Sequence, residues 1–338
     1  MLKNNTVVLA CRDYDRTRRI IDGTVKRDGL QLQISEMTDV ANTFTNMFNG
    51  KYDISEFSLG ELVYHVSRGK KEFIGIPVFP LRMFRHGWIF INSSSGINTP
   101  YDLDKKRIGL YRLAQTACIW IRGLLADEYG VSPSDTYWYL PSIHHWQDDS
   151  EKETFQSRDG STIRWLPRAG PETNIKVVDA ALVNGEVDAV CSAVRPPSFV
   201  QGDPRVKRLV EKYDEAERSY YRKTKIFPIM HTLAVKSSIV EANPELPGRI
   251  FEMFVEAKNR AWQWLRGDGS IGLMWKDRYM EEELELQDDD PWIYGLRANE
   301  HVIQKFLDYC YAQGVSASPL KPQDLFVPAT WDFRDHGF

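Results

Sequence analysis

The chain has 338 residues, a formal net charge of −4 at pH 7 and a hydrophobic content of 42%. The length suggests about two compact units of roughly 150 residues each, and the hydrophobic content excludes a disordered chain. The mild acidity argues against a nucleic-acid partner, which favours a basic face. No apolar run reaches the ~18 residues that span a bilayer, so we expect no membrane association.

Two further features concern the compartment. The first residues, "MLKNNTVVLAC", contain too short an apolar stretch for a signal peptide and continue into an apparent strand, so we expect a cytoplasmic protein. The four cysteines (Cys11, Cys118, Cys191 and Cys310) show no CxxC spacing. They predict buried free thiols and not a disulfide framework or a structural zinc site.

The first quarter of the chain alternates between strand and helix patterns. "TVVLAC" (6–11), "LQLQIS" (30–35), "YDISEFS" (52–58) and "EFIGIPVF" (72–79) read as strands, and 40–50 and 59–70 as helices. Such β-α-β alternation is typical of a largely parallel sheet.

A second α/β series follows. Strands are predicted at 87–92, 108–111, 136–140, 188–193 and 231–236, and helices at 114–130 and 175–187. Residues 141–174 are rich in Ser, Asp, Gly and Pro and predict a long loop, and the chain after residue 243 is nearly all helical. The fold prediction is therefore an α/β, two-lobed protein. The first lobe comprises 1–88 plus 234–338 and the second 89–233, with two crossing strands, a helical C-terminal region and a ligand cleft between the lobes.

Two distant segments match each other. In "PVFPLRMFRHGWIFIN" (77–92) and "IFPIMHTLAVKSS" (226–238), a Phe-Pro pair precedes a histidine that opens an apolar, strand-like run. We expect His86 and His231 to lie at the mouths of the two crossing strands, beside the cleft.

Other candidates come from the ends of predicted strands, where open α/β sheets bind ligands. "CRDYDRTRR" places Arg12 and Asp13 after the first strand, although an exposed helix start explains them equally well. Ser192 and Arg195 follow another strand, and Gln115 and Thr116 lie near a helix N-terminus, which suits an anion.

A series of long segments resembles the 4,5-dihydroxyphthalate decarboxylase family. The segments are "LACRDYDRTRRIIDG", "YDISEFSLGEL", "GIPVFPLRMFRHGWIFIN", "VRPPSFVQGDPRV", "YYRKTKIFPIMHTLAV" and "YGLRANEHVIQKFLDY", and they follow in order over almost the whole chain. The resemblance implies a type II periplasmic-binding-protein-like fold. It also implies loss of CO2 from a hydroxylated aromatic diacid, giving protocatechuate, without an organic cofactor.

Such chemistry requires proton transfer and a clamp for a carboxylate. We therefore assign His86 and His231 as the acid–base pair, in either order, and Asp13 as the group that orients a histidine or receives the phenol hydrogen bond. Arg85 and Arg195 would hold carboxylates. The remaining pocket candidates are Arg12, Ser58, Gln115, Thr116 and Ser192.

Three alternatives stay open. One is a non-catalytic receptor for an aromatic carboxylate, and another is a different lyase on the same fold, such as a menaquinone-pathway enzyme. The third concerns metal: no local motif has metal-ligand spacing, so none is expected, yet His86, His231 and Asp13 would form a recognised ligand set if they converged. The expected partner is a small aromatic carboxylate, and the oligomeric state, a homo-oligomer included, stays open.

Overall fold

The computed structural model describes residues 6–37, 40–141, 154–167, 173–267, 271–286 and 290–337, which form two units. Unit 1 comprises Met1–Met83, Ile226–Gln304 and Leu320–Phe338, and unit 2 comprises Phe84–Lys225 and Lys305–Pro319. The chain thus passes between units near residues 84 and 226, and again at 304/305 and 319/320. Within the described residues, no helix has the length and apolar character that crossing a membrane requires.

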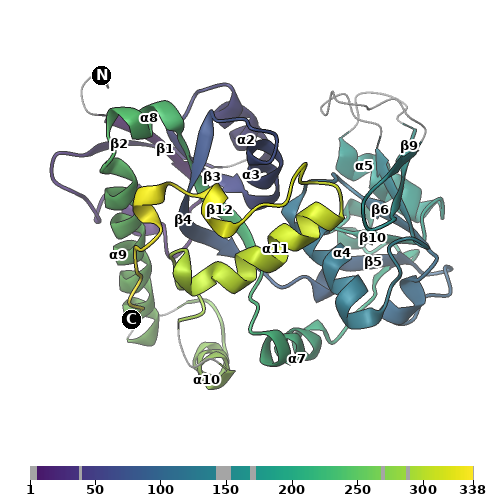
Figure 1. Ribbon diagram of the computed structural model, residues 1–338. Helices are drawn as coiled ribbons and strands as arrows, with labels where there is room; N and C mark the ends of the chain where they lie inside the picture. The colour runs from purple at the N-terminus through teal and green to yellow at the C-terminus, as the bar shows by residue number, and fades with distance from the viewer. Residues whose placement is uncertain are drawn as a thin grey trace. The chain divides into compact units, whose positions relative to one another are not determined.

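Unit 1 contains a five-stranded sheet in the order β2-β1-β3-β12-β4 (Figure 1). The strands are β1 (Thr6–Cys11), β2 (Gln31–Glu36), β3 (Ile54–Ser58), β4 (Phe73–Arg82) and β12 (Ile229–Lys236). β1 pairs in parallel with β2 and β3, whereas β12 runs antiparallel to both β3 and β4. The amino end of β12 therefore lies beside the carboxyl ends of its two neighbours.

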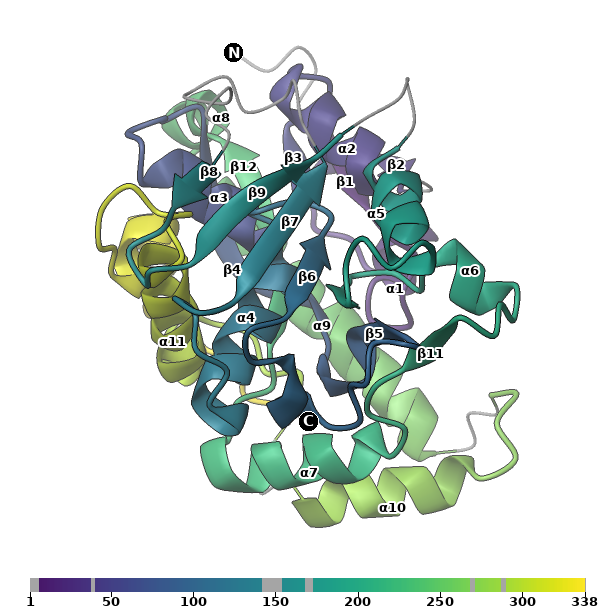
Figure 2. The ribbon, with the colours of Figure 1, turned by 90° about the vertical axis from the view of Figure 1, so that its right-hand side faces the viewer.

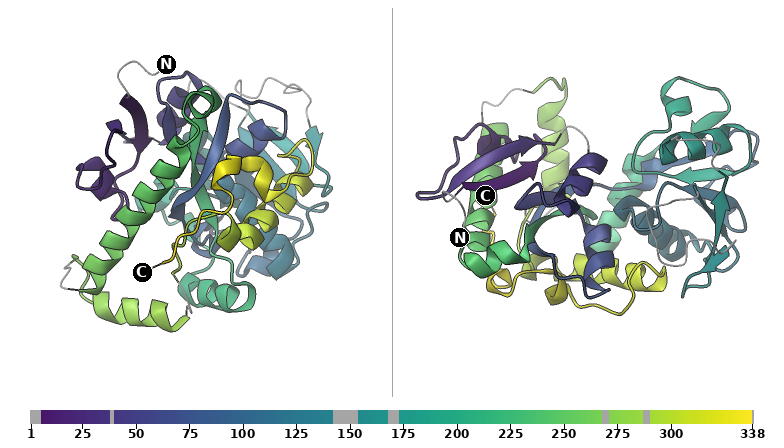
Figure 3. Two further views of the ribbon diagram at one scale, coloured as in Figure 1. Left: turned by 60° about the vertical axis from the view of Figure 1, so that its left-hand side comes forward. Right: turned by 90° about the horizontal axis from the view of Figure 1, so that it is seen from above.

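The helices of unit 1 are α1 (Arg18–Ile21), α2 (Val40–Phe48), α3 (Leu59–Val66), α8 (Ser237–Ala242), α9 (Leu246–Arg266) and α10 (Lys276–Leu286). Ser58 ends β3 and caps α3 by accepting a hydrogen bond from the Glu61 N–H. The long α9 packs against β4 and against the C-terminal 3-10 turn Pro328–Thr330 (Figure 3). Lys258 of α9 is fully buried and pairs with Asp290 and Asp335, which fastens the C-terminal segment to this helix.

Unit 2 contains a seven-stranded sheet in the order β11-β5-β10-β6-β7-β9-β8 (Figure 2). Its strands are β5 (Ile89–Asn92), β6 (Arg107–Leu110), β7 (Tyr137–Pro141), β8 (Thr154–Gln156), β9 (Thr162–Leu166), β10 (Ala189–Cys191) and β11 (Val206–Arg208). β10, β6, β7 and β9 are parallel neighbours, and β5 runs antiparallel to β10. The amino end of β5 therefore lies at the carboxyl edge of the parallel strands, as that of β12 does in unit 1.

The helices of unit 2 are α4 (Thr116–Tyr129), α5 (Asn174–Val183), α6 (Pro197–Val200) and α7 (Tyr213–Thr224). α11 (Glu300–Ala312) begins in unit 1 and ends in unit 2. In unit 2 its residues Phe306 and Tyr309 pack on Trp120 of α4, with ring centroids 5.2 and 5.7 Å apart. This packing explains why 305–319 belongs to unit 2, although the sequence pattern grouped it with the first lobe.

Three local expectations need correction. The predicted loop at 141–174 contains β8 and β9, and β9 pairs in parallel with β7 because Ile163 and Leu166 supply buried positions between polar flanks. Neither histidine opens its strand: His86 begins the 3-10 turn η2 (His86–Trp88) before β5, and His231 is the third residue of β12. The expected buried free thiols are confirmed for all four cysteines.

Candidate functional site

His231 lies at the carboxyl edge of the unit 1 sheet because β12 is antiparallel to its neighbours. Its Cα is in register with Ser58 at the end of β3 and with Leu81 near the end of β4. Side chains two residues apart on one strand share a face, so Glu56 of β3 lies diagonally across from His231 on the same face. Two residues from distant parts of the sequence thus meet at this edge.

Glu56 is fully buried and accepts three hydrogen bonds. His231 Nδ1 lies 2.6 Å from Glu56 Oε1, and the Tyr14 hydroxyl donates to the same oxygen at 2.8 Å. The Arg12 backbone N–H donates to Glu56 Oε2 at 3.1 Å. Both carboxylate oxygens are therefore occupied, and the ring of His231 is fixed by a group that cannot move.

The electrostatics favour an ionised Glu56. Burial acts to raise the pKa of Glu56, but the hydrogen bonds from His231, Arg12 and Tyr14 outweigh it and hold the pKa below its usual value. The anion in turn adds to the effect of burial in raising the pKa of the Tyr14 hydroxyl, which stays protonated and donates.

An ionised carboxylate has no proton to give, so Nδ1 of His231 must be the donor in their contact. The other nitrogen, Nε2, then carries the lone pair of the neutral ring or the second proton of the imidazolium. With 12% of its side chain exposed, His231 is accessible while its carboxylate partner is not. This pairing is the usual arrangement of a histidine that transfers protons.

The predicted partner Asp13 does not hold His231. Asp13 instead makes a two-pronged, partly exposed ion pair with Arg18, at 2.9 and 3.0 Å. Arg12 contributes its backbone to Glu56, while its side chain is exposed. Ser58 is buried as the cap of α3 and lies directly opposite His231 in the sheet. Of the unit 1 predictions, the structure therefore brings Arg12 and Ser58 together with His231.

Unit 2 places Arg85 and His86 at the carboxyl edge of its own sheet. Ile89 at the start of β5 is in register with Cys191 at the end of β10, and η2 immediately precedes it. Arg85 is buried, and its Nη1 donates to the Ala193 carbonyl at 3.4 Å. Burial lowers the pKa of Arg85 to about 10, so the guanidinium keeps its charge at neutral pH.

His86 has an environment opposite to that of His231. Its side chain is buried against the ring of Tyr220, with centroids 5.3 Å apart. Its Nδ1 has no hydrogen-bond partner among the described residues. Burial lowers the pKa of His86 to about 4, so the ring is neutral at pH 7.

The N-terminus of α4 lies at the same edge, because β6 ends at Leu110 just before it. Thr116 is the buried first residue of this helix, and Gln115 is its N-cap. The Gln115 side chain does not cap the helix; its Oε1 accepts a hydrogen bond from Cys118 Sγ at 3.1 Å. The helix N-terminus, with its aligned backbone N–H groups, suits a negatively charged group.

Ser192 and Arg195 follow β10 but differ in role. Ser192 is buried, its hydroxyl bonds to the backbone of Val194, and its N–H donates to the Trp88 carbonyl at 3.0 Å. Ser192 thus ties the turn after β10 to η2. Arg195 is exposed and makes no ion pair with any residue that the structure describes.

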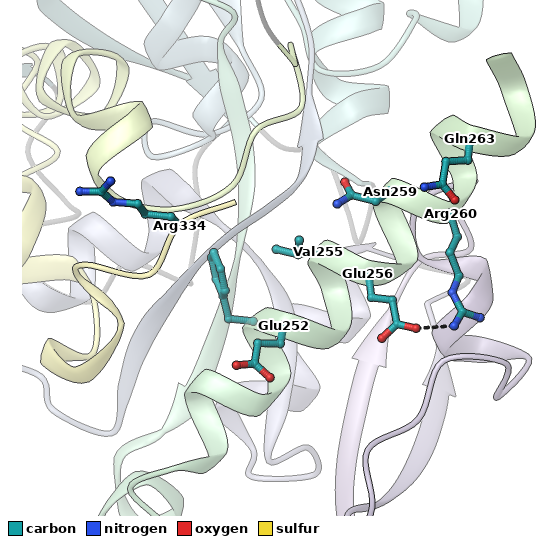
Figure 4. A pocket seen from close by; sticks show the side chains of 8 residues that line it. Glu252, Val255, Glu256, Asn259, Arg260, Gln263 and Arg334 are labelled. Atoms are coloured by element: carbon teal, nitrogen blue, oxygen red, sulfur yellow. Dashed lines mark ion pairs between the residues drawn. The ribbon is translucent and has the colours of Figure 1, made fainter. Parts of the chain in front are cut away.

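The surface carries another hollow, of about 410 Å³, along α9 (Figure 4). Its lining includes Glu252, Glu256, Asn259 and Arg260, and no predicted site residue. Glu256 is already paired with Arg260 at 2.5 Å and with Arg27 at 2.6 Å, so its charge is compensated. In the described part of the chain, no group of three or more His, Cys, Asp or Glu side chains is arranged to hold a metal ion.

Sequence reasoning missed Glu56 and Tyr14. The signal for Glu56 was a charged residue inside "ISEFS", a strand whose other four residues are all buried in the structure. A carboxylate within a central strand requires hydrogen-bond donors from its neighbours, and these donors are Tyr14 and His231.

The fold defines the class of protein. Over 99% of the chain it matches the periplasmic aliphatic sulphonate binding protein SsuA of Escherichia coli, with a TM-score of 0.55, 12% identity and 96% of that structure covered. It also matches the alkanesulfonate-binding protein SsuA of Xanthomonas axonopodis pv. citri, with a TM-score of 0.53, 14% identity and coverage of 97% and 99%. The chain has the α/β two-sheet fold of type II periplasmic binding proteins, with added C-terminal helices, as predicted.

Sequence relatives define the family. The chain is 34% identical to a 4,5-dihydroxyphthalate decarboxylase of Comamonas testosteroni over 327 residues, which covers 95% of this chain and 96% of the relative. It is 32% identical to a Pseudomonas putida protein of the same name over 215 residues, covering 63% and 80%. No protein-family model matches the chain. The protein belongs to the 4,5-dihydroxyphthalate decarboxylase family, which confirms the resemblance, and it is related to a carboxy-lyase.

Proposed function

We propose that the protein removes one carboxylate, as CO2, from a hydroxylated aromatic diacid, with 4,5-dihydroxyphthalate as the substrate and protocatechuate as the product. The relative from Comamonas testosteroni carries this activity in its name. The observation that carries the proposal here is the 2.6 Å contact between His231 and the buried, ionised Glu56 at the carboxyl edge of the unit 1 sheet.

The chemistry requires a proton donor aimed at a ring carbon. If an arene carboxylate left directly, its electron pair would remain in the plane of the ring, where nothing stabilises it. Protonation of the carbon that bears the carboxylate opens another course: the C–C bond then breaks, CO2 leaves, and the electron pair restores the aromatic ring. A hydroxyl para to that carbon supplies electron density for the protonation.

In this proposal His231 is the proton donor. Its imidazolium delivers the Nε2 proton to the ring carbon while Nδ1 stays hydrogen-bonded to Glu56. The negative charge of Glu56 compensates the positive charge of the imidazolium, as a carboxylate does in other histidine pairs. The ring then recovers a proton from water, so the net reaction consumes one proton and releases one CO2 per substrate. Neutral His86 accepts a hydrogen bond from a phenol hydroxyl.

The spectator carboxylate needs a cation, and we propose that Arg85 and Arg195 supply it together with the N-terminus of α4. A guanidinium matches two carboxylate oxygens, and Arg85 keeps its charge in a buried setting where such a contact is strong. The leaving carboxylate should be bound less tightly, because a contact that stabilises the ground state as much as the transition state gives no gain in rate.

The proposal is tested by incubating the purified protein with phthalates that carry hydroxyls at different ring positions and measuring CO2 release. We expect turnover of 4,5-dihydroxyphthalate above the other isomers, and none with phthalate itself, which lacks the para hydroxyl. A His231→Ala preparation controls for contaminating decarboxylases. Tight binding of the panel without CO2 release would overturn the proposal and favour a receptor for aromatic carboxylates.

A further inference from the structure

α7 of unit 2 presents one face to the segment that carries Arg85 and His86 (Figure 2). Positions 213, 217, 220 and 221 of this helix are spaced i, i+4, i+7 and i+8, and they share that face. The Tyr220 ring meets His86, and the Tyr221 ring lies edge-on to Phe84 with centroids 6.2 Å apart. The helix therefore holds both ends of the short segment 84–86.

Gly87 shows how close this packing is. A Cβ atom at residue 87 would lie 2.6 Å from Cγ of Tyr213, closer than real Cβ contacts allow. The backbone of η2 therefore lies directly on the Tyr213 ring, and only glycine fits. A small shift of α7 would displace the Arg85–His86 pair with it.

Glu217 lies in the middle of this face, between the two tyrosines. Its carboxyl group accepts a hydrogen bond from the Gly87 backbone N–H and is close enough to Arg85 to feel its charge. We propose that Glu217 is a positioning residue: it fixes the η2 turn through the Gly87 amide and balances the charge of Arg85 until an anionic substrate arrives. The inference rests on the proposed function, which gives Arg85 its role in binding a carboxylate.

The charges around Glu217 favour a group that titrates near neutrality. Burial is the main cause that raises the pKa of Glu217 to about 7; Asp214 on the same helix adds to it, whereas the Gly87 N–H, Arg208 and Arg85 oppose it. His86 is neutral at this pH and adds no charge. A substrate carboxylate on Arg85 adds a negative charge near Glu217 and so favours its protonated form. Binding of the anion should therefore be accompanied by proton uptake.

Two substitutions separate the hydrogen bond from the charge. Glu217→Gln keeps an oxygen for the Gly87 N–H but cannot ionise, whereas Glu217→Ala loses both functions. Glu215→Gln is a matched control, because Glu215 lies on the same helix but is exposed and paired only with Lys212 at 3.1 Å. Each variant is compared with the wild type as the full chain.

The first measurement is hydrogen exchange at the Gly87 amide in the ligand-free protein, which does not depend on catalysis. We expect exchange at least 10-fold faster in Glu217→Ala, and unchanged exchange in Glu217→Gln and in the control. Equal protection of Gly87 in Glu217→Ala and the wild type would overturn the positioning role. This arm decides the inference even if no phthalate is turned over.

The second measurement is calorimetry of 4,5-dihydroxyphthalate binding at pH 7 in buffers of different ionisation enthalpy. The wild type and Glu215→Gln should take up a fraction of a proton on binding, and Glu217→Gln should take up less. The pH profile of kcat/KM should lose its inflection near pH 7 only in Glu217→Gln. Identical proton uptake in Glu217→Gln would overturn the charge-balancing role, whereas absence of binding by the wild type would count against the proposed function.

Discussion

The surroundings of His231 and of His86 differ in almost every respect that matters for proton transfer. Each histidine lies near the amino end of an antiparallel strand, at the carboxyl edge of a mainly parallel sheet. His231 is partly exposed and held by an ionised carboxylate. His86 is buried against Tyr220, and its Nδ1 has no partner in the described part of the chain.

The contrast shows that a matching sequence context does not give a matching chemical role. A strand two positions away supplies Glu56 to His231, and no carboxylate reaches the His86 ring in the described residues. Burial then keeps His86 neutral, while the anion beside His231 compensates a charged ring. We therefore expect the two histidines to respond differently to the same substitutions.

The largest effect should come from His231→Ala. Loss of the proton donor should lower kcat by about 10³, within the range typical of a general acid. The measurement is the initial rate of CO2 release, with circular dichroism to check folding. His301→Ala, on the exposed face of α11, is the matched control and should keep its rate. A kcat within tenfold of the wild type would remove His231 from the reaction.

Next in size should be Glu56→Gln, with a loss in kcat of about 10². The amide keeps the shape of the side chain but not the charge that compensates the imidazolium. Because Glu56 acts through His231, it should cost little more in a His231→Ala background. Additive losses in the double variant would show that Glu56 acts independently. Tyr14→Phe, which removes one donor to Glu56, should have a smaller effect in the same direction.

His86→Gln should cost only about tenfold in kcat/KM, mainly through KM, because a neutral hydrogen-bonding group is lost and not a proton donor. A loss as large as that of His231→Ala would break the distinction between the two histidines. The variant should also change acid stability. Between pH 6.5 and about 4 the unfolded chain binds a proton at His86 that the native protein does not, so the wild type loses stability as the pH falls through this range. Melting curves over that range should show a weaker loss in His86→Gln.

The smallest effect, no change at all, is expected from exhaustive treatment with a chelator. The proposed reaction runs on protonation, and His231 Nδ1 is already engaged by Glu56. The rate of CO2 release is measured before and after dialysis against the chelator. Loss of activity that one divalent ion restores would recast His231 as a ligand and remove the proton-donor role.

The sequence by itself determined the fold class and most of the elements. Alternating apolar residues predicted the strands at 6–11 and 30–35, and helical periodicity predicted α4 up to its left-handed C-cap Gly130. These features depend on neighbours in the chain, and a local pattern is enough to specify them. The pattern failed at 141–174, because the short strands β8 and β9 lie among polar residues and depend on pairing with each other and with β7.

Only the tertiary structure decided how the site is built. The sequence pointed to His231, Arg85 and the strand ends, since those positions follow from chain order. The partner of His231 depended on the register between β3 and β12, two strands 175 residues apart as measured from Glu56 to His231. Asp13 was the nearer guess because it follows β1, but it turns to Arg18, while Glu56 is fixed by the pleat on the face of His231. Register and burial are properties of packed strands, and for this reason no local motif reveals them.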